Sequence, residues 1–308
     1  MKKHQIEIIQ KSTGKIEGWF SNEAAYLIGS LDEIQQALNI KGDIFEIGVH
    51  HGKSTVFFNH LISGSEKLNV CDIFDSQDQN ISNSGNGDLE VFLKNIKENS
   101  THELGQVHTC LSTNLSPKSI GISYRIFHID GGHNASEALA DLQLASLCII
   151  QKGVIVVDDP FRHEWPGVTE AVIKFLSDNE EFTAAIVGFN KLIILRKKIA
   201  HNYLGFIDDH SFREEFGLGF PCTYKQLPFM DSDLRIFYYS AGIRDPSSLK
   251  IKAYKQIKKN RILKRIVGGV VKKAFLFIQS FKNSLKNSIL LYLFVSLNFK
   301  TTRIPNTC

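Results

Sequence analysis

The stretch FHIDGGHNASEALADLQLASLCIIQKGVIVVDDP, residues 127–160, decides the fold. An apolar run ends at Asp130, a helical stretch follows, and a second apolar run ends at Asp158 and Asp159. This order predicts a strand, a helix and a strand, and the carboxyl ends of parallel strands open on one edge of a sheet, where ligands bind. The three carboxylates and His133 are therefore expected to meet at one rim, as a candidate active site.

The same alternation continues on both sides of this stretch. Apolar runs predict strands at 43–49, 67–74, 106–111, 124–130 and 153–159. Helical patterns fall at 22–38 after the capping residue Ser21, and at 54–62, 89–98, 134–149 and 168–176. Strands that alternate with helices predict βαβ units and a parallel sheet.

Two final apolar runs, 182–189 and 191–197, are almost contiguous. A parallel crossover needs roughly a dozen residues or more, so these runs predict an antiparallel hairpin. The expected fold class is α/β: a Rossmann-like doubly wound sheet of five parallel strands plus a terminal antiparallel hairpin, with a basic helical C-terminal extension.

The first predicted strand runs into the turn FEIGVHHGKST, with the spacing Glu46-x-Gly48-x-x-x-Gly52. Glycines let the backbone turn and approach a ligand without a Cβ in the way, and Ser54 starts a helix whose free N–H groups face the turn. A dinucleotide fingerprint needs three glycines as G-x-G-x-x-G, which this turn lacks. The second strand ends at Asp72, where a carboxylate can accept hydrogen bonds from ribose hydroxyls. These five residues are predicted to bind a nucleoside cofactor.

The glycine turn, the terminal hairpin and the motifs IDGGH (129–133) and VVDDP (156–160) resemble the class I S-adenosylmethionine (SAM) dependent methyltransferases. In its motifs the chain is most similar to the metal-dependent sugar O-methyltransferases of the macrocin and mycinamicin type, over roughly residues 20–200. The resemblance implies SAM as cofactor, His133 as general base and a sugar or glycoside hydroxyl as methyl acceptor. It also implies Mg²⁺ bound by Asp130, Asp158 and Asp159. Relatives often carry Glu-Asp where this chain has two aspartates.

The chemistry of such a rim suits methyl transfer to a hydroxyl. An alcohol is a poor nucleophile until it loses its proton, Mg²⁺ takes oxygen ligands and can acidify a bound hydroxyl, and a histidine can collect the proton. Simpler interpretations stay open. Asp130 could cap the following helix, Asp158 and Asp159 before Pro160 could form a turn, and His133 could lie on the surface.

The chain divides into four segments by pattern. A strand and helix lead-in is expected over 1–40, with Ile6, Ile8 and Ile9 as strand-like residues. The SAM-binding domain is expected over 41–199. The aromatic-rich segment 200–249 is expected to pack on the sheet edge or to form part of the acceptor pocket, and a basic amphipathic helical tail is expected over 250–308.

Charge is distributed unevenly between the body and the tail. Residues 250–308 contain 11 Lys, 3 Arg and no acidic residue, so the first 249 residues carry 22 basic and 32 acidic side chains. An acidic body excludes a global nucleic-acid binder. The longest uncharged run of the tail, 287–299, is 13 residues, whereas a membrane span needs about 20. Peripheral contact with anionic lipid through 250–300 and docking on the protein or a partner both stay open.

Composition and motifs limit the remaining classes. The five cysteines form no CxxC pair and the N-terminus has no export signal, which favours a cytoplasmic protein, with peripheral attachment at the inner face of the membrane left open. A small-molecule or glycan acceptor is expected as partner, and homo-oligomerisation stays open. The alternative functions are a membrane-recruited, non-catalytic scaffold with a Rossmann-like domain and an NAD-dependent oxidoreductase, which the missing third glycine disfavours.

Overall fold

The computed structural model describes residues 3–239, which lie within one compact unit. The predicted basic tail over 250–308 and its membrane contact lie outside the described residues. Within the described part, no helix has the length and apolar character needed to cross a membrane.

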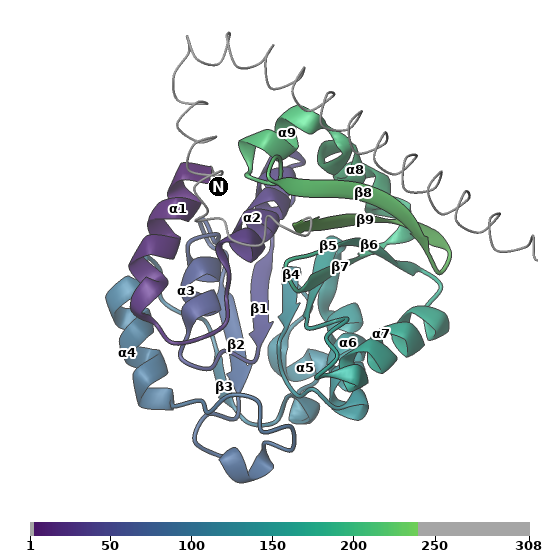
Figure 1. The fold of residues 1–308 in the computed structure, drawn as a ribbon. Coiled ribbons are helices and arrows are strands. Elements are labelled where there is room, and N and C mark those ends of the chain that lie inside the picture. Colours follow the sequence, from purple (N-terminus) through teal and green to yellow (C-terminus); the bar gives the residue numbers. More distant parts are fainter. Residues whose placement is uncertain (1–2, 240–308) are drawn as a thin grey trace, which may run out of the picture. The chain divides into compact units, whose positions relative to one another are not determined.

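The centre of the unit is a single mixed sheet (Figure 1). Over residues 3–239 it has nine strands in the order β3-β2-β1-β4-β5-β7-β6-β9-β8. Their bounds are β1 Asp43–Ile47, β2 Leu68–Asp72, β3 Val107–Thr109, β4 Tyr124–Ile129, β5 Ile149–Asp158, β6 Phe182–Gly188, β7 Lys191–Arg196, β8 Cys222–Phe229 and β9 Ser232–Tyr239. Strands β1 to β5 pair in parallel, and β6 and β7 form an antiparallel hairpin that joins β5 through β7. The predicted α/β architecture is confirmed.

Helices cover both faces of this sheet and bury two apolar layers (Figure 1). One layer involves α1 Lys3–Ser12, α2 Asn22–Ala37, α3 Lys53–Asn59, α4 Leu89–Asn99 and α8 Lys197–Asp208. The other involves α5 Pro117–Ile120, α6 Ala135–Cys148 and α7 Pro166–Asp178. The capping residue expected for α2 is present, because Ser21 Oγ accepts a hydrogen bond from the Ala24 N–H at 3.1 Å.

The N-terminal lead-in differs from its prediction as a strand. Residues 3–12 form helix α1, in which Ile6 and Ile9 are buried while Ile8 is exposed. A strand would place Ile6 and Ile8 on one face, whereas residues three apart share a face of a helix. The three isoleucines therefore follow the helical period, which a short segment does not distinguish reliably from a strand.

The segment after β7 continues the sheet. Helices α8 and α9 (His210–Glu215) lead to the hairpin β8–β9, and β9 pairs in parallel with β6. The expectation that 200–249 packs on the sheet edge or forms part of the acceptor pocket stays a prediction, and residues 240–249 lie outside the described part of the chain. The sequence alternation was not sufficient to predict two further strands here, because strand β8 is largely exposed and lacks an apolar run.

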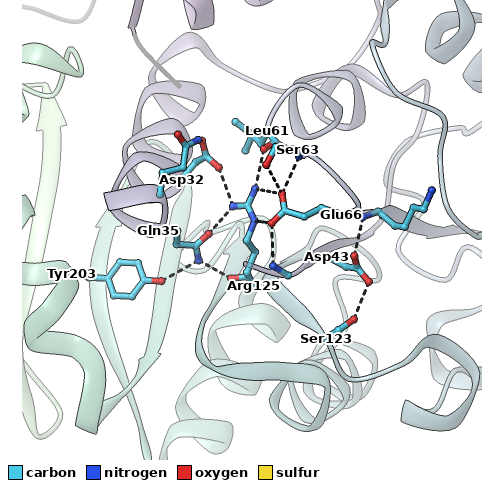
Figure 2. Close-up of polar contacts among 12 residues, drawn as sticks. Asp32, Gln35, Asp43, Leu61, Ser63, Glu66, Ser123, Arg125 and Tyr203 are labelled. Atoms are coloured by element: carbon cyan, nitrogen blue, oxygen red, sulfur yellow. Dashed lines mark hydrogen bonds and ion pairs between the residues drawn. The ribbon is translucent and has the colours of Figure 1, made fainter. Parts of the chain in front are cut away.

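A buried charge cluster connects the helices to the amino-terminal end of β4 (Figure 2). The guanidinium of Arg125 lies 2.9 Å from an Asp32 carboxylate oxygen and 3.0 Å from one of Glu66, and donates to Gln35 Oε1 at 2.7 Å. Gln35 in turn donates to Tyr203 Oη at 3.0 Å. Arg125 therefore holds α2, the α3–β2 connection and, through Gln35, α8 against the sheet.

Removing this cation is expected to destabilise the fold. Arg125→Ala leaves Asp32 and Glu66 as buried charges without their partner, which lowers the free energy of unfolding by about 3–5 kcal/mol. Urea unfolding followed by circular dichroism measures the change. The control is Lys174→Ala, which breaks the exposed pair Lys174–Asp178 and should leave the free energy of unfolding close to that of wild type. Equal effects of the two substitutions would contradict the role of Arg125.

Candidate active site

The carboxyl ends of β1, β2, β4 and β5 open into one cleft of about 390 Å³. Its wall includes the start of the glycine turn, the end of β2, the loop after β4 and the two aspartates after β5. The sequence-predicted residues that line it are Gly48, Asp72, Asp130, His133, Asp158 and Asp159. The position of this cleft follows from the parallel strands, whose ends lie on one edge.

Gly48 allows β1 and β4 to end in close contact. Its φ is +78°, and a Cβ on this residue would lie 1.7 Å from the carbonyl oxygen of Asp130. The Gly48 N–H donates to Cys71 O at 2.9 Å, and the Asp130 N–H donates to Ile47 O at 2.8 Å. A side chain at position 48 would therefore displace the backbone that carries Asp130.

Asp72 holds the glycine turn in place. One of its carboxylate oxygens accepts from the N–H groups of Val49 at 2.7 Å and His50 at 2.9 Å, and the other accepts from Phe74 N–H at 2.7 Å. A carboxylate has about four lone-pair sites, so a further donor such as a ribose hydroxyl can still bind. The predicted contact of Asp72 with a ribose stays a prediction.

The other three residues predicted to bind the cofactor, Glu46, Gly52 and Ser54, lie within or beside the glycine turn but outside the cleft lining. Glu46 is fully buried, and its Oε1 lies 3.1 Å from Nδ1 of His128, its neighbour across β1 and β4. Gly52 precedes α3 with φ +88°, and Ser54 is buried in the first turn of that helix. Within the described residues none of these three lines the cleft, and their direct contact with a cofactor stays a prediction.

Asp130 and Asp158 form an acidic centre at the base of the cleft. Ligand atoms of His128, Asp130 and Asp158 all lie within 4.8 Å of one another. Loss of contact with water and the charge of Asp158 raise the pKa of Asp130 well above its usual value, although Lys191 opposes this shift. The two carboxylates therefore lie close enough to compete for one proton or for one cation.

Lys191 lies in this acidic centre. It is the first residue of β7 and pairs with Asp158 across the antiparallel β5–β7 ladder. Its side chain is 2% exposed, and its Nζ forms an ion pair with Asp158 Oδ2. Burial alone would lower the pKa of Lys191, but the charges of Asp158 and Asp130 raise it above its usual value.

Asp159 points to a second group of residues. It has φ +55°, and its carboxylate accepts from Asn190 Nδ2 and lies 3.3 Å from His133 Nε2 and 3.4 Å from Arg162. Burial alone would raise its pKa, but the hydrogen bonds from His133 and Asn190 and the charge of Arg162 lower it. The ring of His133 stacks near that of Trp165, with centroids 4.4 Å apart. Asp159 and His133 thus form a carboxylate–imidazole pair in the cleft.

Residues 45–160 match a protein family described as "Methyltransferase domain". This region of the chain is similar to methyltransferase domains. This match covers the strands whose order and whose glycine turn form the cleft. A comparison with curated proteins finds no match.

Solved structures of O-methyltransferases are similar to this chain at low identity. The O-methyltransferase NovP is 14% identical over 56% of this chain and 80% of that chain, with a TM-score of 0.47. An O-methyltransferase from Bacillus cereus in complex with SAH is 15% identical over 63% and 90%, with a TM-score of 0.44. TomG from Streptomyces achromogenes, involved in tomaymycin synthesis and solved with SAM, is 15% identical over 62% and 86%, with a TM-score of 0.39.

The size and lining of the cleft suit a small-molecule cofactor of the size of SAM. The volume of the cleft lies in the range of about 300–1,000 Å³ that is usual for small-ligand sites. The close approach of strand ends at Gly48 leaves bare backbone at the wall of the cleft. Gln77 and Asn80 of the loop after β2 and His50 of the glycine turn also line it.

The residues predicted to bind Mg²⁺ do not suit this ion. The oxygens are of the type that Mg²⁺ prefers, but Asp158 uses one for Lys191 and the other for Asn190 at 3.0 Å. Asp159 is engaged with Asn190, His133 and Arg162. The three predicted ligands do not converge as a set, because His128 rather than Asp159 joins Asp130 and Asp158. With Lys191 in place, these residues do not fit a magnesium ion.

Sequence reasoning missed several residues of the site: His128, Arg162, Trp165, Asn190 and Lys191. A signal existed for two of them. His128 precedes Asp130 by two positions on a strand, so both side chains point to the same face, and Lys191 interrupts an apolar run between two buried strands. Asn190 and Arg162 lie in turns whose conformation the sequence does not specify. His163, in the loop between β5 and α7, is 93% exposed in its side chain and does not line the cleft.

One buried acid lies outside these two groups. Asp141 of α6 is 1% exposed and packs near Gly131 and Ser112, both of which line the cleft. Burial raises the pKa of Asp141 to about 7; the charge of Glu137 adds to this shift, and the hydroxyl of Ser112 opposes it.

Gly48→Ala tests the close approach of β1 and β4. Strain at a positive φ costs about 1–2 kcal/mol, and overpacking against Asp130 adds about 1–3 kcal/mol. We also expect SAM affinity to fall at least about tenfold, a change of about 1.4 kcal/mol. Urea unfolding and calorimetric titration with SAM measure both effects. The control is Gly64→Ala, which has φ +61° and open space around its Cβ; it should show the strain alone and normal SAM binding. Normal binding by both variants would contradict the account.

Asp141 is expected to make stability depend on pH. The folded protein keeps a proton on Asp141 up to about pH 7, whereas an unfolded chain releases it near pH 4. Its contribution is therefore fully present below about pH 4 and is lost as the pH rises to about 7. Asp141→Asn should gain stability relative to wild type across this window, by urea unfolding at pH 5 and 7.5. A constant difference between the two proteins would show that Asp141 does not titrate in this way.

Proposed function

We propose that this protein transfers a methyl group from SAM to a hydroxyl of a small-molecule acceptor, a sugar or glycoside, and that His133 is the general base. The observation that carries this proposal is the pair formed by His133 and Asp159 in the wall of the cleft. This pair and Gly48 of the glycine turn line the same cleft. We propose the glycine turn as the binding place of the cofactor.

The environment of His133 supports its role as base. Its Nε2 faces Asp159, while its Nδ1 is buried and, among the described residues, has no hydrogen-bond partner. A buried polar atom without a partner costs free energy, which an acceptor hydroxyl can offset by donating to it. Asp159 fixes the orientation of the ring and stabilises the imidazolium that forms when the proton arrives.

The chain has three tasks in this reaction. SAM, when bound, supplies a methyl group that is already activated on its sulfonium sulfur. Gly48 and the glycine turn bind and orient the cofactor, Trp165 positions His133, and His133 removes the proton of the acceptor hydroxyl. Alignment of the acceptor with the methyl group is the main source of acceleration that we assign to the cleft. Lys191 and Asn190 occupy the two oxygens of Asp158, so these oxygens are not available to a metal ion during the reaction.

The proposal also specifies the class of the acceptor, a sugar or glycoside. The motifs IDGGH and VVDDP support this class by resemblance. The wall of the cleft has both polar and apolar side chains, which suits a ring with hydroxyl groups. Incubation with labelled SAM and a panel of nucleotide sugars and aryl glycosides tests the class, with methylated product identified by mass spectrometry. Transfer to thiols or amines but to no hydroxyl would refute it.

His133→Ala tests the base. Loss of a general base lowers kcat by about 10²–10⁴-fold, whereas SAM binding by calorimetry should change less than about threefold, or under about 0.7 kcal/mol. The matched control is His163→Ala, whose side chain is exposed on the neighbouring loop and should leave kcat unchanged. Comparable kcat values for His133→Ala and wild type would exclude His133 as the base.

A further inference from the structure

The acidic centre contains its own counter-ion. Asp158 and Lys191 face each other across β5 and β7, and the ammonium pairs with Asp158 Oδ2. The charges of Asp130 and Asp159 also act on it. If this buried cation were removed, the carboxylates around it would be left as uncompensated buried charges, which is strongly destabilising.

The surroundings of Lys191 keep its ammonium inside the protein. Its side chain is 2% exposed, and its Nζ lies 5.7 Å from the ring centroid of Phe20, just before helix α2. Asn190, the preceding residue, donates to Asp158 Oδ1 at 3.0 Å and also bonds Asp159. The hairpin turn thus delivers an amide and an ammonium to the two consecutive aspartates.

A second observation shows what this place could hold without Lys191. His128 is fully buried, its Nδ1 bonds Glu46, and its Nε2 has no hydrogen-bond partner among the described residues. Ligand atoms of His128, Asp130 and Asp158 lie within 4.8 Å of one another. One imidazole and two carboxylates are a donor set for a transition metal ion such as Mn²⁺ or Zn²⁺, and Lys191 is the positive charge that such an ion would have to replace.

We propose that Lys191 is the resident cation of the acidic centre, that it takes the place of a divalent metal ion there, and that removal of its charge opens a metal site formed by His128, Asp130 and Asp158. Lys191 acts as a positioning residue: it neutralises Asp158 and holds the strand ends together beneath the cleft. This inference concerns the cations of the site and does not depend on the identity of the acceptor.

Mn²⁺ binding tests the inference directly. Purified full-length wild type and Lys191→Met are titrated with Mn²⁺, with free ion followed by electron paramagnetic resonance. Wild type should bind no Mn²⁺ that is sensitive to Asp158→Asn. Lys191→Met should bind Mn²⁺ at least about a hundredfold more tightly, the order expected when a unit charge a few ångströms away is removed at intermediate dielectric constant. This binding should disappear in the double variant Lys191→Met/Asp158→Asn.

Two results would overturn the inference. One is Mn²⁺ binding by wild type that Asp158→Asn abolishes, because Lys191 would then not exclude a metal. The other is a folded Lys191→Met variant that gains no Mn²⁺ binding. If Lys191→Met fails to fold, the wild-type arm still decides, together with Lys191→Arg, which keeps the charge and should also bind no Mn²⁺. SAM titration of wild type with and without EDTA separates this inference from the proposed function: equal SAM binding supports it whether or not an acceptor is found.

Discussion

The pairing of β5 with β7 is the constraint on which the site depends. Parallel strands bring their carboxyl ends to one edge, so Asp130 and Asp158 approach each other, and burial together with the charge of Asp158 raises the pKa of Asp130. The antiparallel return of β7 begins at that edge and places Lys191 opposite Asp158. A parallel strand in the same place would present its carboxyl end there, and its first residue would lie at the far edge of the sheet. The hairpin therefore provides the charge compensation that the parallel part of the sheet requires.

The two edges of the sheet compensate buried charge for different purposes. At the amino-terminal edge, Arg125 is surrounded by Asp32 and the Gln35 amide of α2 and by Glu66 of the α3–β2 connection (Figure 2). The interactions of this cluster contribute to packing of the helices against the sheet. At the carboxyl-terminal edge the acids face a cleft, and within residues 3–239 His133 Nδ1 and His128 Nε2 have no hydrogen-bond partner. Unsatisfied polar atoms are costly in a core but useful at a site that binds a ligand.

The sequence was sufficient to predict the five parallel strands, the terminal hairpin and the position of the cleft, because apolar runs, helical periods and the short link before β7 each leave few alternatives. It was also sufficient to predict that Asp130, Asp158, Asp159 and His133 meet at one rim. It was not sufficient for the partners of these acids. A lysine at the start of a strand usually lies in solvent, and only the register of β5 with β7 shows that Lys191 turns inward. The N-terminal isoleucines and strand β8 were missed because short or exposed segments carry too little periodicity.

The charges at the site also suggest why a carboxylate–imidazole pair suits the proposed reaction. Methyl transfer from a sulfonium to a neutral hydroxyl moves the positive charge from sulfur to the base that takes the proton. In this cleft that base is His133, and Asp159 lies 3.3 Å from it with a pKa lowered by His133, Asn190 and Arg162, so it is ionised when the charge arrives. Asp158 cannot serve the same purpose, because Lys191 already neutralises it. Two consecutive aspartates thus have separate tasks: the first holds the resident cation, and the second receives the charge that the reaction creates.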